Sequence, residues 1–448
     1  MSVTTRIAPS PTGYLHFGLA RTALFCYLYA KKHGGSYILR IEDTDLARNK
    51  PEFEADIHEQ FSWLGLAPDA TYKQSDHRER HRAALESLIA KDAAYISREP
   101  AKDDPSRSVE VVRLRNAGEK ITFTDLIRGE ITFDTTELGD FVIARSLEEP
   151  LYHMAVVVDD YDEGVTHVIR GEDHISNTQR HILIQRALGF THPAYAHLPL
   201  ILMADKSKMS KRREGSSIKY YREQGILPQA LINYVALLGW NPGTDQEIFA
   251  LDELVEAFDI SQVGKSGAIF DKEKLHWYNR EYLNRLSVDE YASYAHATLQ
   301  AALHKRAIEM QGDIPARILD VIRERVSSLA DLQTLVGDGE LDFFFRDATL
   351  VKEKIPQKGS DMSTAAKHLA HVHDVWAAID AESFRQVERL KESIWEYATT
   401  EGRGTVLWPL RYALSGREKS PDPFMIATIL GKETSLARIN EARAYLTP

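Results

Sequence analysis

The chain contains very little cysteine. Cys26 is the only cysteine among 448 residues, so no internal disulfide can form. It lies within the apolar stretch 24–28, which predicts a buried, space-filling side chain rather than a catalytic thiol. The chain also lacks an apolar run of membrane-spanning length, and its N-terminus lacks the regions of a signal peptide. We therefore expect a cytoplasmic protein with no membrane partner.

Positive charge is also scarce relative to negative charge. The chain has 55 Lys and Arg residues and 66 Asp and Glu residues, which gives a formal net charge of -11. Because a phosphate backbone attracts broad basic surfaces, this balance argues against nonspecific nucleic-acid binding. It leaves open a specific RNA partner bound through a local basic stripe. The length and the 43% hydrophobic content are ordinary for a globular protein of roughly two to four domains.

The N-terminal segment has the pattern of a strand, a turn and a helix. Residues 4–8 can form a short strand, prolines and glycines follow, and residues 19–33 are apolar at helical spacing. Gly13 and Gly18 let the backbone approach a ligand, and the start of a helix offers N–H groups to an anion. His16 would donate to a phosphate oxygen there. The alternative is an ordinary turn with His16 on the surface.

A second segment, residues 206–213, is rich in lysine and arginine and is followed by Gly215. Such a loop can swing. Lysines that reach a phosphoryl group late, such as Lys208 and Lys211, stabilise the charge of a transition state more than they stabilise bound ATP. The alternatives are a solvated basic loop or a nuclear-localisation tract. Together, the two segments indicate attack of a carboxylate on the α-phosphate of ATP.

Charged residues follow two predicted buried strands. The strand 37–41 ends at Glu42, and the strand 165–170 ends at Arg170. Open parallel sheets bind ligands at the carboxyl ends of their strands, so Glu42 could hold an amino group and Arg170 could clamp a carboxylate. The alternative for the acidic segment 42–45 is helix capping by its aspartates. The alternative for Arg170 is a structural ion pair with the acidic residues at 172 and 173.

The predicted sheet is interrupted and then followed by helices. Residues 93–145 contain short β-type runs, and the apolar runs 155–160 and 165–170 then resume the buried pattern of an α/β sheet. Acidic residues at 159, 160, 172 and 173 match no metal-binding spacing. From residue 228 onward the pattern is helical, with clear amphipathic runs at 289–305 and 314–329 and brief strand signals near Val406. We predict a multidomain fold of an α/β part and an all-α part.

The chain resembles the bacterial-type glutamyl-tRNA synthetases, which are class I aminoacyl-tRNA synthetases. The resemblance extends from residue 5 to about residue 440 and rests on several specific segments. These are Thr5-Arg6-Ile7-Ala8-Pro9-Ser10-Pro11-Thr12-Gly13 with His16 and Gly18, Arg40-Ile41-Glu42-Asp43-Thr44-Asp45, residues 165–173, Lys208-Met209-Ser210-Lys211-Arg212, Phe270-Asp271-Lys272-Glu273-Lys274-Leu275, and Pro409-Leu410-Arg411 with Ala413-Leu414-Ser415-Gly416.

The resemblance implies a fold and its division into domains. A Rossmann-like, parallel-sheet catalytic domain would comprise residues 1–92 and 146–240. A short β-rich insertion at 93–145 would bind the acceptor end of tRNA, residues 241–310 would contact its stem, and an α-helical region at 311–448 would read the anticodon. In that last region the candidates for phosphate or base contacts are Arg389, Arg403, Arg411 and Arg417.

The resemblance also implies roles for the site residues. Glutamate would be bound by Arg6, Ser10, Glu42, Tyr152 and Arg170, and which arginine takes which carboxylate stays open. ATP would be bound by Thr12, His16, Gly18, Lys208, Met209, Ser210 and Lys211. The catalytic residues would be His16, Lys208 and Lys211.

The implied reaction forms glutamyl-adenylate from glutamate and ATP, with release of pyrophosphate, and then charges the terminal adenosine of the glutamate tRNA. Mg²⁺ would accompany ATP, and the protein would be a monomer. Charging of the glutamine tRNA is left open. The insertion lacks the cysteine cluster that some relatives use for zinc, so we predict no zinc. Two residues depart from the general class I signatures: Leu19 stands where they often have histidine, and Arg212 stands where they have serine.

Two other classes of protein remain as alternatives. A small-molecule nucleotidyltransferase could share the N-terminal turn and the basic loop, but it would have little use for the long helical region after residue 228. A noncatalytic tRNA-binding protein would have no reason to keep His16, Lys211, Glu42 and Arg170 together. A truncated paralogue that modifies tRNA would lack the helical half.

Overall fold

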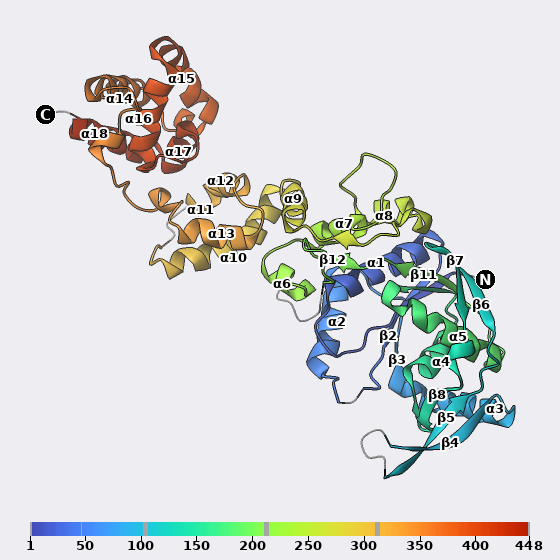
Figure 1. Ribbon diagram of the computed structural model, residues 1–448. Coiled ribbons are helices and arrows are strands. Elements are labelled where there is room, and N and C mark those ends of the chain that lie inside the picture. Colours follow the sequence, from blue (N-terminus) through green and yellow to red (C-terminus); the bar gives the residue numbers. More distant parts are fainter. Residues whose placement is uncertain (1, 46, 102–105, 210–214, 310–313, 447–448) are drawn as a thin grey trace. The chain divides into compact units, whose positions relative to one another are not determined.

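The protein is described by a computed structural model that covers residues 2–45, 47–101, 106–209, 215–309 and 314–446 (Figure 1). The chain forms two compact units, Met1–Tyr282 and Leu283–Pro448. The first unit contains a mixed seven-stranded sheet, and the second is helical in its described residues. This agrees with the α/β and all-α parts predicted from the sequence.

The seven-stranded sheet has the order β3-β2-β1-β10-β11-β6-β7, and its first six strands run parallel. The antiparallel β7 closes one edge. The strands in this order are β3 (Ala70–Lys73), β2 (Ser36–Ile41), β1 (Thr4–Ile7), β10 (His167–Gly171), β11 (Ala194–Leu198), β6 (Lys120–Asp125) and β7 (Gly129–Asp134).

Helices cover both faces of this sheet. On one face α1 packs against β1, β2 and β10, with α7 and α8 behind it. On the other face α3, α4 and α5 share a core with Ile38, Val168 and Tyr195 of the sheet. The helices of this unit are α1 (Phe17–Lys32), α2 (Pro51–Trp63), α3 (Arg78–Ala90), α4 (Tyr152–Asp162), α5 (Ile175–Leu188), α6 (Ile218–Glu223), α7 (Pro228–Leu237), α8 (Leu251–Ala257) and α9 (Lys272–Leu283).

The N-terminal β1–α1–β2 unit shows how the sequence builds these layers. Side chains alternate along β1, so Thr5 faces α1 and donates from its hydroxyl to the Cys26 carbonyl at 2.8 Å, whereas Arg6 points to the opposite face. Cys26 is fully buried, and burial raises the pKa of its thiol to about 12. The prediction of a space-filling cysteine is therefore confirmed.

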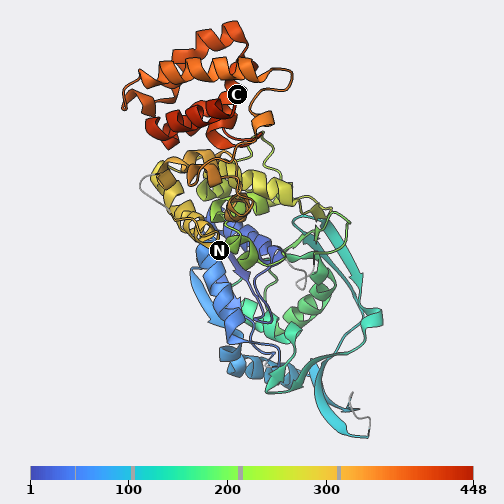
Figure 2. The same ribbon diagram turned by 90° about the vertical axis from the view of Figure 1, so that its left-hand side faces the viewer.

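The inserted segment contributes to two sheets. A separate antiparallel sheet consists of β4 (Ala94–Pro100), β5 (Ser108–Leu114), β8 (Phe141–Ser146) and β9 (Glu149–Pro150). The β4–β5 hairpin projects from the body of its unit (Figure 1 and Figure 2). In contrast, β6 and β7 extend the seven-stranded sheet through β11. The strands of the inserted segment were correctly predicted. The domain boundaries given above stay predictions.

One apolar run has a different structure from its neighbour. Residues 155–160 resemble a strand by their three consecutive valines, but they belong to α4. Its valines pack into the core on the α3–α5 face of the sheet, and this tertiary burial overrides their β propensity. The second run, 165–170, provides most of the strand β10 as expected, which begins at His167 and ends at Gly171.

The described part of the second unit consists of helices, and a long connection, residues 338–361, separates α13 from α14. The run 314–329 is divided between two short helices and a following segment, and Val406 lies in a helix, so the strand signals there were wrong. The helices are α10 (Val288–Lys305), α11 (Ile314–Arg317), α12 (Leu319–Arg323), α13 (Leu329–Gly337), α14 (Met362–Ala377), α15 (Val387–Glu401), α16 (Arg403–Ser415), α17 (Pro423–Leu430) and α18 (Lys432–Leu446). None of the described helices has the length and apolarity that a membrane crossing requires.

The turn between α1 and β2 generates a stability prediction. A Cβ atom on Gly35 would lie 2.0 Å from the Val3 carbonyl oxygen, which is backbone and cannot move aside. Gly35→Ala should therefore destabilise the protein by about 2 kcal/mol or more, as for overpacking, measured by urea unfolding. Gly13→Ala is the control, since nothing lies within 4 Å of its added Cβ. Equal stability of the two variants would contradict this packing argument.

Candidate active site

Three arginines lie on neighbouring parallel strands and face the same side of the sheet. Arg40 is the residue before the last of β2, Arg6 lies in β1, and Arg170 lies in β10. The chain passes from β1 to β2 on one side and returns to the other side at β10, so β1 lies at the point where the strand order reverses. Open α/β sheets bind ligands beyond the carboxyl ends of their strands at such a point. The three guanidinium groups therefore mark a candidate site.

Two of these arginines are neutralised by α4. The Asp160 carboxylate accepts from Nε of Arg6 at 3.0 Å and from Nη2 of the same side chain at 3.3 Å. It also lies 2.8 Å from Nη2 of Arg40, whose Nη1 donates to Glu163 at 2.7 Å. These ion pairs hold the pKa of Asp160 below its ordinary value against the opposing effect of burial. Arg6 and Arg40 are thus held in place by protein carboxylates.

Arg170 has a different environment. Its Nε donates to His197 at 3.1 Å, one Nη donates to His181 at 3.2 Å, and the other donates to Thr178 at 2.8 Å. The residue is only 5% exposed, and no carboxylate within the described part of the chain lies at ion-pair distance from it. Burial lowers the pKa of the guanidinium, yet an arginine stays charged at neutral pH. Arg170 is therefore a buried cation with neutral partners.

The alternative structural role of Arg170 is not observed. Glu172 forms an ion pair with Arg128, and Asp173 lies 3.1 Å from Nζ of Lys208. Both acidic residues that could have neutralised Arg170 therefore have other partners. A buried, uncompensated cation is unfavourable, and a bound anion would remove that cost.

Glu42 lies beside this cluster at the carboxyl end of β2. Its carboxylate is 3.5 Å from Nη2 of Arg40, and its backbone N–H donates to the Pro9 carbonyl. Burial raises the pKa of Glu42 to about 7, and the negative charges of Asp160 and Asp159 act in the same direction. The cluster thus contains more carboxylates than cations, and a positively charged group near Glu42 would restore the balance.

The capping alternative for the residues after Glu42 is not observed. Asp43 accepts from the backbone and the hydroxyl of Ser75, and Asp45 pairs with Arg48. Lys50 precedes α2 and makes no side-chain cap.

Tyr152 and Ser10 are the other predicted members of an amino-acid pocket. Tyr152 begins α4, and its hydroxyl lies 3.4 Å from Nδ1 of His174. The surrounding protein desolvates the phenol and raises its pKa to about 12, although the residue is 39% exposed, and the charges of Glu42, Arg170 and Arg6 also act on it. The Tyr152 hydroxyl is therefore within electrostatic reach of all three. Ser10 is exposed just beyond β1.

The predicted ATP segment lies at the start of α1. His16 is the N-cap residue, and its Nδ1 accepts weakly from the Leu19 N–H at 3.4 Å. A Cβ atom on Gly18 would meet the His16 ring at 3.3 Å, so the glycine allows the ring to lie against the first turn. Thr12 precedes this start, and its N–H donates to the Ser10 carbonyl at 2.8 Å. The arrangement leaves α1 with its positive dipole end next to the turn.

Both ends of the basic loop are fixed by backbone hydrogen bonds. On the incoming side, the Met209 N–H donates to Ile201 of β12 (Ile201–Leu202), which pairs with β13 (Ala268–Ile269). On the outgoing side, the Phe17 N–H donates to Ser216 at 3.2 Å, beside His16. The loop therefore returns to the start of α1. Ser210, Lys211 and Arg212 lie outside the described residues, so their predicted roles are not located.

Several residues of the site were not found from the sequence. Asp160 was considered only as a metal ligand, and Glu163 was not singled out, because the valine run does not show that both belong to the end of one helix. The buried partners of Arg170, which include His181, His197 and Thr178, are separated along the chain and share no local motif. Only one signal could have indicated them. Thr178 and His181 are three residues apart in one helix, and this spacing places both side chains on the same face.

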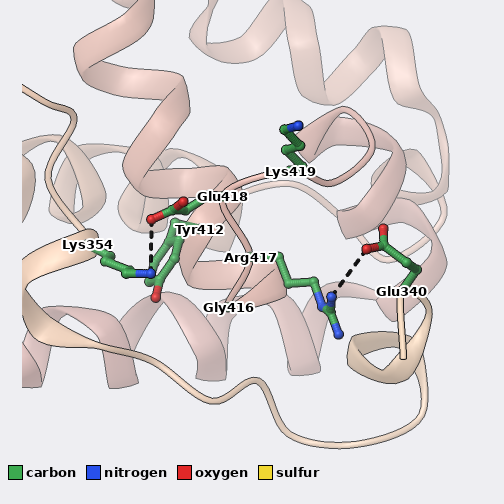
Figure 3. A pocket seen from close by; sticks show the side chains of 7 residues that line it. All are labelled: Glu340, Lys354, Tyr412, Gly416, Arg417, Glu418 and Lys419. Atoms are coloured by element: carbon green, nitrogen blue, oxygen red, sulfur yellow. Dashed lines mark hydrogen bonds and ion pairs between the residues drawn. The ribbon is translucent and has the colours of Figure 1, made fainter. Parts of the chain in front are cut away.

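The second unit contains a polar cavity of about 200 Å³ at the end of α16. Two ion pairs lie in its wall, Lys354–Glu418 at 3.0 Å and Arg417–Glu340 at 3.4 Å (Figure 3). Gly416 allows the chain to turn there, since it has φ of +65° and its Cβ would meet the Thr349 carbonyl oxygen at 2.6 Å. Two of the cations that line the cavity, Lys354 and Arg417, are thus neutralised within the same wall.

The chain matches two family models. The first is described as tRNA synthetases class I (E and Q), catalytic domain, and it matches residues 2–103 and 96–277. The second is described as an anticodon binding domain and matches residues 274–443. The two matches follow each other along the chain and together extend over almost all of it.

Curated relatives are similar along the whole chain. The glutamate–tRNA ligase 1 of Syntrophus aciditrophicus is 38% identical over 472 residues, which cover 99% of this chain and 98% of the relative. The glutamate–tRNA ligase 1 of Acidithiobacillus ferrooxidans is 38% identical over 482 residues, with complete coverage of both. A crystal structure of a glutamate tRNA ligase from Elizabethkingia meningosepticum, in complex with its amino acid, has a TM-score of 0.86 at 31% identity and covers 100% of both chains.

The excess of carboxylates predicts a pH-dependent cost in stability. The folded protein holds a proton on Glu42 up to about pH 7, whereas the ordinary pKa of a glutamate is 4.5, so its contribution to stability falls as pH rises through this window. Glu42→Gln removes that titration. It should stabilise the protein at pH 8 by about 1–3 kcal/mol, measured by urea unfolding at pH 5 and pH 8.

The control is Glu52→Gln on the exposed first turn of α2, which loses only a surface pair with Lys50 and should change stability by about 1 kcal/mol or less, and equally at both values of pH. A loss of stability at pH 8 in the Glu42 variant would show that its carboxylate is favourably paired rather than in excess.

Proposed function

The chain belongs to the glutamate–tRNA ligases of the class I tRNA synthetase family, and from this premise we propose how its residues perform the reaction. A glutamate–tRNA ligase joins the glutamate α-carboxylate to the α-phosphate of ATP, releases pyrophosphate, and transfers the glutamyl group to the 3′-terminal adenosine of the glutamate tRNA. The observation that carries the assignment of the site is the buried Arg170, whose partners are all neutral.

We propose that glutamate lies between Glu42 and the two arginines Arg6 and Arg170. Glutamate has two carboxylates and one ammonium group. The site offers the guanidinium group of Arg170, which has no counter-ion, the guanidinium group of Arg6, which shares Asp160 with Arg40, and the carboxylate of Glu42. Among the described residues, Nη1 of Arg6 makes no hydrogen bond, and Nη1 of Arg170 uses only one of its two N–H groups. Each arginine can therefore still donate to a ligand. Tyr152 and Ser10 complete the pocket.

The charges of the pocket support selection of glutamate over glutamine. An amide nitrogen would bring N–H donors to arginines that also only donate, and these groups would be left unpaired. The neighbouring histidine lone pairs offer no alternative, since His181 and His197 accept from Arg170. A glutamine side chain would therefore lose the hydrogen bonds that a carboxylate forms.

We propose that ATP binds at the start of α1, with contacts from Thr12, His16 and Gly18. The helix start provides N–H groups and the positive dipole end for phosphate oxygens. Lys208, Met209, Ser210 and Lys211 would approach from the loop, which begins at β12 and returns beside His16. Lys208 is at present paired with Asp173 and would exchange that exposed partner for a phosphate. Mg²⁺ would enter with ATP, held mainly by phosphate oxygens and water.

We propose that the second unit binds the anticodon of the tRNA near the cavity at the end of α16. Arg417 lines this cavity, and Arg411 lies over the Trp408 ring at 5.0 Å, next to it. Unstacked bases are recognised by stacking and by contacts to their edges, which an arginine over an indole can provide. Arg403 lies over Trp395 at 4.6 Å and is a second candidate, whereas Arg389 is exposed.

Several finer expectations stay predictions. They are charging of the glutamine tRNA, the absence of zinc, the monomeric state and the cytoplasmic location. Charging assays with purified glutamate and glutamine tRNAs and labelled glutamate address the first of these directly.

Arg170→Ala tests the glutamate pocket. Removal of the buried cation should raise the glutamate KM by roughly 100-fold or more, because a charge-assisted pair is lost, and should leave the ATP KM nearly unchanged. Both constants are measured by charging of the glutamate tRNA. Arg186→Ala is the control, since Arg186 pairs with Glu119 on the exposed side of α5. An unchanged glutamate KM would remove Arg170 from the pocket.

Lys211→Ala tests the late-arriving cation. We expect tRNA-dependent pyrophosphate exchange to slow by roughly 100-fold, the scale of one lost transition-state contact, while the ATP KM changes by about threefold or less. Lys206→Asn is a matched control in the same loop, because φ of +63° at Lys206 suits asparagine. Equal losses in the rate and in ATP binding would contradict the proposed role.

A further inference from the structure

Arg170 donates to His197, and His197 is paired with the buried Asp125. Asp125 ends β6 and is paired with β11, and His197 of β11 is in register with Arg170 of β10. His197 and Asp125 are 0% and 1% exposed. The pair therefore lies between the inserted strands and the candidate glutamate pocket, and it has no access to solvent.

The hydrogen bonds of this pair fix the tautomer of the histidine. One oxygen of Asp125 lies 2.6 Å from Nδ1 of His197. The second oxygen accepts from the backbone N–H groups of Ile127 at 3.0 Å and Arg128 at 2.9 Å, which prevents the carboxylate from rotating. An ionised carboxylate only accepts, so the His197 proton must be on Nδ1. The lone pair on Nε2 is then free to accept from Nε of Arg170 at 3.1 Å.

A second histidine, His181, also accepts a hydrogen bond from Arg170. Nδ1 of His181 accepts from Nη1 of Arg170, and its Nε2 lies 3.1 Å from Nδ1 of His153. Burial lowers the pKa of His181 well below its ordinary value and lowers that of His153 to about 4. The rings of His181 and His153 are thus neutral at physiological pH. Arg170 is oriented by lone pairs that carry no formal charge, so its own charge remains for a ligand.

We propose that Asp125 and His197 are positioning residues, which orient the Arg170 guanidinium toward the substrate carboxylate by holding His197 in the Nδ1–H tautomer. The inference rests on the proposed glutamate pocket. It assigns to the inserted segment, through the last residue of β6, a role in amino-acid binding. Neither residue touches the substrate, and both act through Arg170.

Asp125→Asn separates orientation from folding. The asparagine oxygen can keep the bonds from the Ile127 and Arg128 N–H groups, and its NH₂ then occupies the place of the oxygen that faces His197. An NH₂ group donates, so His197 must accept on Nδ1 and carry its proton on Nε2. That proton points at the Nε–H of Arg170, so two hydrogen-bond donors would face each other without an acceptor. The guanidinium must turn away, although the fold is kept.

The expected result is a glutamate KM increased roughly 10- to 100-fold, as when one buried hydrogen bond is lost. The ATP KM and the kcat at saturating glutamate should change by about threefold or less. Charging of the glutamate tRNA gives all three constants, and thermal unfolding checks the fold. A glutamate KM within about twofold of the original protein would overturn the proposal.

Asp125→Ser distinguishes the tautomer from a purely structural role. The serine hydroxyl can still accept from the turn N–H groups, but it is too short to reach His197 and places no donor there. His197 can then keep its proton on Nδ1, so the glutamate KM should rise less than in Asp125→Asn, even though more buried contacts are lost. If Asp125 were only structural, the serine variant would have the larger effect on KM, and this order would refute the tautomer argument.

Asp374→Asn is the matched control. Asp374 also lies beside a histidine, with 3.1 Å between its Oδ1 and Nδ1 of His373, but this pair is on the surface of α14. All kinetic constants should be unchanged. Failure of the unmodified protein to charge tRNA with glutamate would reject the proposed function itself, whereas normal charging with an unaffected Asp125→Asn variant would reject this inference alone.

Discussion

The structure of the site depends on an unequal neutralisation of three buried arginines. Asp160 of α4 is shared by Arg6 and Arg40, so one carboxylate fixes two strand ends. Arg170, one strand further along, receives only histidine, threonine and carbonyl partners. Because burying a cation without a counter-ion is costly, this difference concentrates the affinity for an anion at one end of the row.

The same asymmetry is repeated with opposite sign at Glu42. Burial raises the pKa of both Glu42 and Glu163 to about 7, and the carboxylates of Asp159 and Asp160 add to this effect, since Arg40 and Arg6 face more carboxylates than they can neutralise. One end of the site thus has an excess of positive charge and the other an excess of negative charge. A zwitterionic amino acid with a second carboxylate complements both. The site is therefore less stable than a fully paired network would be, as is common where a protein binds a charged substrate.

The sequence predicted the residues that lie at strand ends and failed for those that meet through tertiary packing. Glu42 and Arg170 were found because a buried strand has a recognisable period and parallel strands present their carboxyl ends at one edge. The valine run of α4 was misleading, since burial on both sides gives helices and strands the same apolar pattern. The break in the helical run 314–329 was also missed, and it contains no proline or glycine after Pro315 that would indicate it.

Asp125 shows most clearly why the remainder of the site was inaccessible to sequence reasoning. It belongs to a segment that reads as an independent β insertion, and its distance of 45 residues from Arg170 along the chain gives no sign of their relation. Only the parallel pairing of β6 with β11 brings it behind His197, and only the hydrogen-bond directions then connect it to the guanidinium. On the proposal made above, the insertion thus helps to orient the guanidinium group of Arg170. The register of β6 against β11 therefore determines whether the Asp125 carboxylate reaches His197.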